Sequence, residues 1–582
     1  MATDNKYDRQ LRLWGANGQK KLSESCIVLV NATAVGTETL KNLCLPGVGK
    51  FHIIDDAKLS PSTSPQDPFS NFFVFRDQDS NGTPQDRAEI ATKHLSELNP
   101  DVIGSFTSVD SLETADYKSM FSSLAETGQN LLVIASDLPA SILKKISSIC
   151  WDGIRSKPIP LVIVKSFGLI GSVRIQTPYH AIIESKPDNE KPDLRLAPTS
   201  MNASVFPELA ALVEKTNLDQ MDSKDHSHVP YVILLLKAMQ SWRKNNEKDD
   251  NALPKTFAEK EEYKKELKSL ARDMNMELNF IEADQNYYLA YTDLEIPFEV
   301  QELIDSAQEN LSQKVEKKAD IDMFDVLLLA LKKFMEGHDG FPPLNGSIPD
   351  MTASTQGYIE LQTIYKSKAE NDVQQMKKII AAIGDDYDAD MTGVIPLVSD
   401  DDLNVFCKNI YNLRLIKTRS YCQEYDFEFG DDKDELLSDV AMSTFDPYDD
   451  PVHTPILWYI ALKACDLFYD EHGHYPGQDD RELALESDAK NVQKYITEIL
   501  SKIGLDENEL VQSTLLSTEE EKDMAFAKEM TRYNNAEIHN IASVIGGVAS
   551  QEAVKLITGK FIPMDGTYIF NGIVGVAGVI KL

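Results

Sequence analysis

Apolar strands and amphipathic helices alternate through the first third of this 582-residue chain, and no other feature constrains the fold as strongly. Short runs rich in Val, Ile and Leu are separated by segments in which apolar residues recur with the helical period. Strands that alternate with helices favour a mostly parallel sheet, because each crossover helix packs against the sheet that it connects. We therefore predict a doubly wound, Rossmann-like α/β domain with strands at residues 26–30, 51–55, 103–109, 130–136 and 159–166.

The turn between the first strand and its helix lacks the glycines of a phosphate-binding turn. In such a turn a Cβ atom would block a pyrophosphate from the backbone N–H groups at the helix N-terminus. The positions from Asn31 to Gly36 read Asn, Ala, Thr, Ala, Val and Gly, so only Gly36 remains. Asp55 ends the next strand, where a ribose-binding acid is expected, but Asp is equally common there as a turn or capping residue. The sequence predicts the framework of a nucleotide site with most of its cradle filled.

The middle of the chain differs in character from both ends. From about Lys191 long helical periods replace the strands, and they continue to about residue 530. The α/β character then returns with an apolar helix that stops at Gly559 and with strands at 566–573 and 576–582. We predict one α/β domain, formed by residues 1–190 and 531–582, that is interrupted by a mainly helical insertion at residues 191–530.

The composition excludes several classes of partner. The formal net charge is -35, from 58 Lys and Arg residues against 93 Asp and Glu residues. Such a polyanion repels nucleic acid phosphates and anionic lipid heads, so we expect neither nucleic acid nor membrane as a partner. No apolar run approaches the length of a membrane-spanning helix. Six cysteines without a CxxC pair indicate a reducing compartment, and we expect the protein in the cytoplasm, the nucleus or both.

Motifs for metal binding and for thiol catalysis are missing from the sequence. Cysteine and histidine do not occur at the spacing of a zinc site, so we expect no bound metal. Cys407 and Cys422 have no neighbouring histidine to activate a thiol, and a buried or incidental thiol is the favoured interpretation. The other cysteines lie in apolar, periodic contexts typical of a core: Cys26, Cys44, Cys150 and Cys465.

A set of short segments resembles the activating enzymes of ubiquitin-like proteins and their bacterial sulfur-carrier relatives, which share the ThiF/MoeB-type adenylation fold. The segments are KYDRQLRLWG at 6–15, LPGVG at 45–49, IID at 53–55, SNFF at 70–73 and the helix with Gly546-Gly547 and Gln551-Glu552-Ala553. Within this family the chain is most similar to the regulatory, non-catalytic subunits of the heterodimers that start neddylation. DHSHVP, GSIPDM, HYPG and the stretch from Asn535 to Lys555 carry that likeness over essentially the full length.

This resemblance implies a function in ATP-dependent activation of a ubiquitin-like modifier. Family enzymes adenylate the C-terminal carboxylate of the modifier with Mg-ATP, and most then transfer it to a catalytic cysteine as a thioester. In this chain Val74 stands where a phosphate-binding arginine belongs, and the lysine before the next helix is replaced, with Asp86 and Arg87 nearby. A buried polyphosphate would lack donors, so we expect the chain itself to bind no cofactor. The degenerate remnants of the pocket are Gly36, Asp55, Asn71 and Asp137.

Two further positions bear on catalysis. Asp137 falls where the family keeps a magnesium-binding aspartate, but the favoured interpretation is the N-cap of the helix after Leu138-Pro139. No cysteine of this chain has the P-x-C-T context of the family's catalytic cysteine. The resemblance therefore implies that thioester formation takes place on another chain.

Arg9 matches a catalytic arginine of the family. In the family, the arginine of the YDRQ-like segment reaches across the dimer into the partner's ATP site, and a surface salt bridge is the plainer alternative. The implied partners are a catalytic subunit that uses Mg-ATP, the ubiquitin-like modifier and, as a further candidate, the conjugating enzyme. The alternatives are the small subunit of the SUMO-activating enzyme and a pure scaffold with no role in catalysis.

Overall fold

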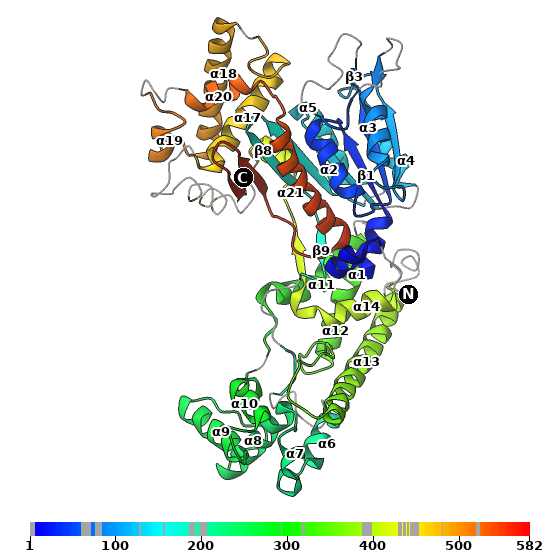
Figure 1. The fold of residues 1–582 in the computed structure, drawn as a ribbon, viewed down its shortest axis with the longest axis vertical. Coiled ribbons are helices and arrows are strands. Elements are labelled where there is room, and N and C mark those ends of the chain that lie inside the picture. The colour runs from blue at the N-terminus through cyan, green and yellow to red at the C-terminus, as the bar shows by residue number, and fades with distance from the viewer. Residues whose placement is uncertain are drawn as a thin grey trace. The chain divides into compact units, whose positions relative to one another are not determined.

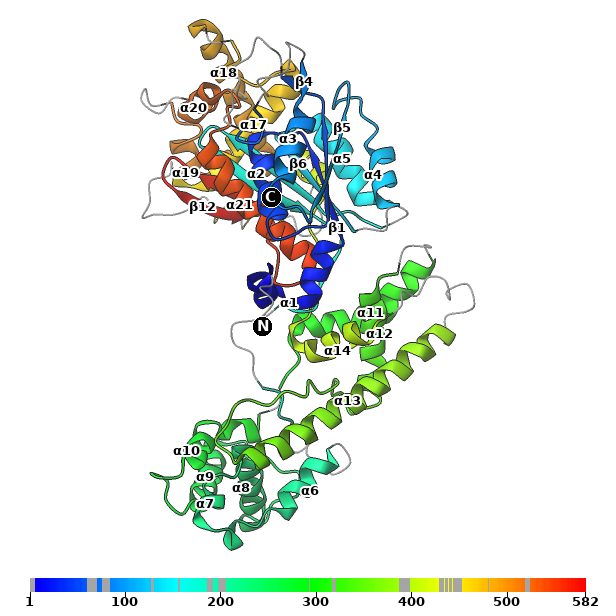
Figure 2. The same ribbon diagram turned by 45° about the vertical axis from the view of Figure 1, so that its right-hand side comes forward.

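The chain forms two compact units, one of Met1–Ile182 with Leu415–Leu582 and one of Ile183–Arg414 (Figures 1 and 2). The structure is a computed structural model. It describes residues 6–59, 71–75, 84–126, 130–154, 157–185, 192–196, 206–292, 294–316, 321–386, 398–428, 434, 438, 442, 453–479, 481–518 and 524–581.

An eight-stranded sheet forms the centre of the first unit, in the order β12-β11-β8-β7-β6-β1-β2-β5. Its strands are β1 (Ser25–Val30), β2 (Lys50–Asp55), β5 (Ile103–Ser108), β6 (Asn130–Ser136), β7 (Leu161–Phe167), β8 (Ile170–Gln176), β11 (Thr567–Asn571) and β12 (Val576–Ile580). The five strands from β7 to β5 run parallel, and β8, β11 and β12 are antiparallel to their neighbours. This arrangement confirms the predicted α/β sheet. Strand β8 was not predicted, because Gly171, Ser172 and Arg174 interrupt its apolar pattern.

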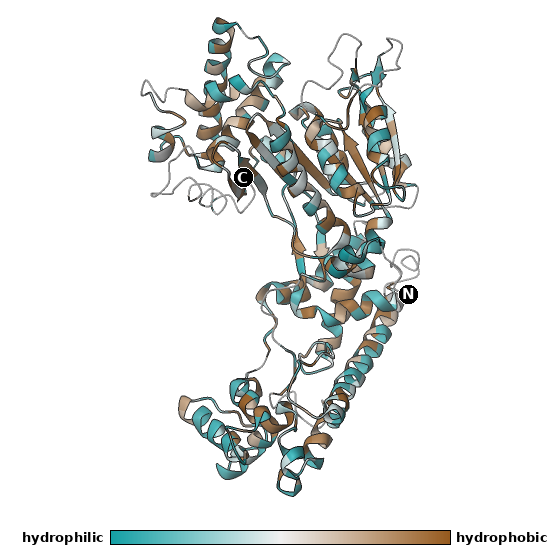
Figure 3. Ribbon diagram, viewed as in Figure 1, coloured by the Kyte–Doolittle hydropathy of each residue, from teal (hydrophilic) through white to brown (hydrophobic). Residues whose placement is uncertain are grey.

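Helices cover both faces of the parallel strands. Ile27 and Leu29 of β1 join a core with α2, α3 and α21, whereas Val28 and Val30 point to the opposite face and pack with α4 and α5. Figure 3 shows central strands that are largely hydrophobic, between helices that carry both hydrophilic and hydrophobic residues. The helices of these layers are α1 (Asp8–Ser23), α2 (Ala34–Cys44), α3 (Arg87–Ser96), α4 (Tyr117–Ala125), α5 (Ala140–Asp152) and α21 (His539–Thr558).

A second helical group packs on the antiparallel end of the same sheet. Ile170 of β8 and Ile569 of β11 share a core with Trp458 and Ile496. The segment from Leu415 therefore belongs to the first unit, whereas the sequence-based insertion extended to residue 530. The two divisions differ because these helices, although far from the strands in sequence, bury their apolar faces on them. The helices are α15 (Tyr421–Tyr425), α17 (Pro455–His472), α18 (Glu482–Ile503), α19 (Glu509–Ser513) and α20 (Ala525–Tyr533).

The second unit is mainly helical. Trp242, Tyr263 and Tyr365 are fully buried in one of its cores. Its helices are α6 (Pro207–Lys215), α7 (Ser223–His226), α8 (Tyr231–Asn245), α9 (Phe257–Ser269), α10 (Leu278–Gln285), α11 (Phe298–Glu316), α12 (Met323–Glu336), α13 (Thr355–Asp386) and α14 (Asp400–Lys408). In the described parts of either unit, no helix combines the length and apolar character that crossing a membrane requires.

Candidate functional site

The turn between β1 and α2 connects a buried strand to a helix, and Gly36 is its only glycine. Asn31 adopts a left-handed conformation with φ 72°, which Asn tolerates better than most residues. Thr33 is the N-cap of α2, and its Oγ1 accepts a hydrogen bond from the Gly36 N–H. A side chain therefore satisfies a helix donor that a ligand would otherwise meet.

Gly36 is needed for packing. A Cβ atom at this position would lie 2.9 Å from both Leu29 Cδ1 and Ser136 Oγ. The remaining glycine of the turn thus allows α2 to approach β1 and β6 closely, which is the role of the third glycine in a dinucleotide-binding turn. Its retention does not require a bound nucleotide.

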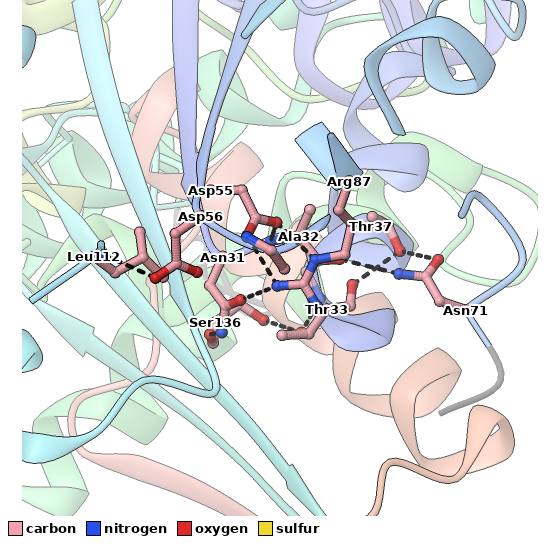
Figure 4. A network of polar contacts seen from close by, with 12 residues as sticks. Asn31, Ala32, Thr33, Thr37, Asp55, Asp56, Asn71, Arg87, Leu112 and Ser136 are labelled. Carbon is pink, nitrogen blue, oxygen red and sulfur yellow. Dashed lines mark hydrogen bonds and ion pairs between the residues drawn. The ribbon is translucent and has the colours of Figure 1, made fainter. Parts of the chain in front are cut away.

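Asp55, at the end of β2, is neutralised from within the chain (Figure 4). Arg87, the first residue of α3, donates from Nε to Asp55 Oδ2 at 2.8 Å and from Nη2 to Oδ1 at 3.0 Å, and also donates to Asn31 Oδ1. The Ala32 N–H donates to the same carboxylate at 2.9 Å. The side chain of Asp55 is fully buried, so its charge needs this bidentate partner.

Asn71 and Val74 close the turn on its other side. Asn71 Nδ2 donates to the Ala32 carbonyl at 3.1 Å, and its Oδ1 accepts from Thr37 Oγ1 at 3.0 Å. Val74, which stands where the family has a phosphate-binding arginine, is completely buried in the core with α2 and α3. Asn71 therefore links the segment 71–75 to the turn and to the first turn of α2, while Val74 anchors the same segment in the core.

Glu537 occupies the N-terminus of α2. Its Oε2 accepts from the Ala34 N–H and its Oε1 from the Val35 N–H, both at 2.9 Å. Burial raises the pKa of this carboxyl above its usual value. Glu537 lies 503 positions from Ala34 and was not predicted from the sequence. The only signal in the sequence was an acidic residue just before the closing helix.

Asp137 lies beside Glu537, and it does not cap α5. That helix begins at Ala140 with Pro139 as N-cap and no side-chain cap, so the N-cap interpretation was wrong. Asp137 has a left-handed backbone, φ 45°, and its Oδ1 accepts from the Ser166 N–H at 2.9 Å. Burial and the adjacent Glu537 raise the pKa of Asp137 well above its usual range. Its carboxyl is directed into the sheet instead of along the helix that follows it.

Arg9, near the start of α1, differs from these buried and paired charged residues. Its side chain is exposed, and within the described residues it has no ion pair or hydrogen-bonding partner. Asp8 pairs instead with Arg12 at 2.9 Å, one turn further along the helix. A surface salt bridge, the plainer explanation of Arg9, is not formed within the described part of the chain.

The cysteines are mostly buried, which disfavours a thiolate. Burial raises the pKa of Cys26 to about 11 and the pKa of both Cys44 and Cys407 to about 12, and it also raises those of Cys150 and Cys465. Cys422 is partly exposed. The described residues contain no cluster of three or more His, Cys, Asp or Glu side chains that could hold a metal ion.

The family of this chain follows from comparison with known sequences. The sequence pattern of the ThiF family matches residues 7–575. The NEDD8-activating enzyme E1 regulatory subunit of Gallus gallus is 33% identical over 580 residues, which cover 98% of this chain and 96% of that protein. The NEDD8-activating enzyme E1 regulatory subunit AXL of Arabidopsis thaliana is 35% identical over 575 residues, covering 98% and 97%.

Among solved structures, E. coli MccB with succinimide has a TM-score of 0.22 and 16% identity, covering 30% of this chain and 48% of that chain. That value is too low to contribute to the assignment, which rests on the sequence matches. The resemblance inferred from the short segments is confirmed by full-length identities of 33% and 35%. The chain belongs to the ThiF family and, within it, to the NEDD8-activating enzyme E1 regulatory subunits.

Proposed function

We propose that this chain is the non-catalytic half of a heterodimer that activates a NEDD8-type modifier, and that adenylation and thioester formation take place on the catalytic subunit. The observation that supports this division most strongly is the state of the β1–α2 turn. Glu537 accepts hydrogen bonds from the first N–H groups of α2, and Arg87 forms a bidentate ion pair with the Asp55 carboxylate. The residues present do not fit an ATP phosphate, because the donors that would bind it already have acceptors.

Arg9 is the residue that we propose to act in the partner's site. Its guanidinium is exposed and has no partner within the described residues, so no contact among those residues accounts for its position. An arginine supplied by one protein to the phosphoryl site of another stabilises charge in the transition state and accelerates reaction by roughly 10³ to 10⁵. Mg-ATP would then be bound by the catalytic subunit, with Arg9 reaching it in trans.

The other partners follow from the same proposal. The modifier and the conjugating enzyme would meet a complex that carries the strongly acidic charge of this chain, -35. Charge of one sign steers oppositely charged partners during association. We therefore propose basic surfaces on at least one of these partners, and a common location in the cytoplasm or nucleus. A pure scaffold would make the same contacts but would leave Arg9 without a role.

ATP–pyrophosphate exchange with the modifier tests the proposal. It is measured with this chain alone, the catalytic subunit alone and the pair, at equal concentrations. Exchange that requires the pair, together with no ATP binding by this chain alone in equilibrium dialysis, is the expected result. Exchange by this chain alone would overturn the proposal, and full exchange by the catalytic subunit alone would reduce this chain to a scaffold.

A further inference from the structure

Every backbone donor of the β1–α2 turn already has an acceptor in the chain. Asn31 N–H donates to the Ile54 carbonyl, Thr33 N–H to the Asn31 carbonyl and Gly36 N–H to Thr33 Oγ1. The remaining three, from Ala32, Ala34 and Val35, donate to carboxylates of Asp55 and Glu537. The first N–H groups of an α-helix have no partner inside the helix, so complete satisfaction of a buried N-terminus requires acceptors from elsewhere.

Glu537 contacts the turn as an anionic ligand would. Its two oxygens accept from the consecutive N–H groups of Ala34 and Val35, each at 2.9 Å, at the start of an 11-residue helix. The helix dipole favours negative charge at this end, and two N–H groups pointing at one anion form a typical phosphate site. A carboxylate with two such bonds therefore has the hydrogen-bonding pattern of a bound phosphate oxygen pair.

The segment that presents Glu537 is itself held firmly. The Gly168 N–H donates to the Ala536 carbonyl at 2.7 Å, and a Cβ atom at Gly168 would lie 2.1 Å from the ring of Tyr533. Just beyond, a Cβ atom at Gly546 of α21 would lie 2.9 Å from Glu38 of α2. The backbone before and after Glu537 is therefore closely packed, and this packing holds its carboxylate against the turn.

We infer that Glu537 is an intramolecular ligand that fills the phosphate position of the degenerate turn, so that the cradle remains an anion site whose occupant is part of the chain. The excluded ligand class is a phosphate-type anion. The inference shares with the proposed function the premise that this turn takes no nucleotide, but it does not depend on Arg9. It adds that the N–H cradle is intact and becomes available when the carboxylate is removed.

Replacement of Glu537 in the full-length chain tests this inference with inorganic phosphate as the probe. In Glu537→Ala the Ala34 and Val35 N–H groups lose their acceptor, so we expect a lower thermal midpoint and faster deuterium uptake in peptides covering residues 31–44. Phosphate should reverse both effects in a saturable way, at least tenfold more strongly than in the wild type. Chloride at matched ionic strength separates specific binding from screening, and Glu507→Ala, at an exposed residue, is the matched control.

Glu537→Gln provides a second variant in case the alanine variant does not fold. Its amide keeps the size and one acceptor but no charge, so we expect a smaller loss of stability and a weaker phosphate response than for alanine. An equal phosphate response in wild type and variants would overturn the inference, as would variants with unchanged deuterium uptake and no phosphate response. ATP binding by the wild-type chain would instead contradict the proposed function, so the two failures are distinguishable.

Discussion

The β1–α2 turn and the start of α1 differ in whether their charged side chains are buried and paired within the chain. In the turn, Asp55 is fully buried and paired with Arg87, and Glu537 accepts two N–H groups. At the start of α1, Arg9 is exposed and has no partner within the described residues, although Arg12 one turn away is paired with Asp8. A group that serves only stability is expected to be satisfied within its own chain.

The comparison indicates which part of an adenylation fold this chain still uses. Internal pairs replace the ligand in the turn, which therefore contributes to folding instead of binding. The exposed Arg9 contributes little to folding, because even paired surface charges are worth only about 0 to 1 kcal/mol. We expect substitutions in the turn to lower stability and substitutions at Arg9 to lower activity, and the variants below test this separation.

Arg9→Ala has the largest expected effect. In the pair with the catalytic subunit we expect ATP–pyrophosphate exchange to fall by roughly 10³-fold or more, because a transition-state charge in the partner's site loses its counter-charge. The thermal midpoint of the chain should not change. Arg12→Ala is the matched control and should keep exchange within a few-fold of the wild type. An Arg9→Ala pair with full exchange would show that the exposed arginine has no catalytic role.

Arg87→Met should have the largest effect on stability. It leaves the buried Asp55 carboxylate without its bidentate partner, and breaking such a buried pair costs about 3 to 5 kcal/mol. Urea unfolding measures the loss, and Arg12→Ala, which breaks an exposed pair, should cost less than about 1 kcal/mol. Equal losses for the two variants would mean that the pair in the turn is no more important than a surface pair. Adding Asp55→Asn to Arg87→Met should recover part of the stability.

Local patterns in the sequence were sufficient to predict the parallel sheet and the defective turn. The strand before Asn31 is uniformly apolar, and the missing glycines are adjacent positions. The internal ligand was not predictable, because Glu537 meets Ala34 across 503 positions and no spacing rule connects them. Arg87 was noted only as a neighbour of a missing lysine, since its bond to Asp55 depends on how β2 and α3 meet. The N-cap interpretation of Asp137 failed because contacts with β7 determine where its carboxyl points.

Asp137 and Glu537 form an acidic pair beside the turn, and Asp137→Asn tests this pair through the pH dependence of stability. Burial and Glu537 raise the pKa of Asp137, while Lys165 acts in the opposite direction. A carboxyl whose folded pKa exceeds its unfolded value loses stability as the pH rises from about 4 through the folded pKa. Asn resembles the protonated form, so the variant should avoid this loss and be more stable than the wild type at pH 8.

Thermal midpoints between pH 4 and pH 8 measure this difference. The exposed Asp110→Asn should follow the wild-type curve and is the matched control. A parallel shift of the Asp137→Asn curve, with no change in shape, would mean that Asp137 is ionised in the folded protein throughout this range. That result would mean that Asp137 and Glu537 do not share a proton in the folded protein. The hydrogen bonds of Glu537 to α2 would be unaffected.

Cys422→Ser should have the smallest effect, and its absence of effect is informative. Cys422 is the only cysteine that is not buried, and its Sγ lies 3.7 Å from the Lys144 carbonyl and from Ser147 Oγ. These neighbours and Ser148 Oγ, at 3.6 Å, are uncharged, and none of them is a base that could activate the thiol as a nucleophile. In the pair, transfer of the modifier to the catalytic subunit's thioester should stay within twofold of the wild type, as judged on non-reducing gels. A loss of thioester in Cys422→Ser with exchange retained would place part of the thiol chemistry on this chain. Arg9 would then not be the only residue through which this chain contributes to catalysis.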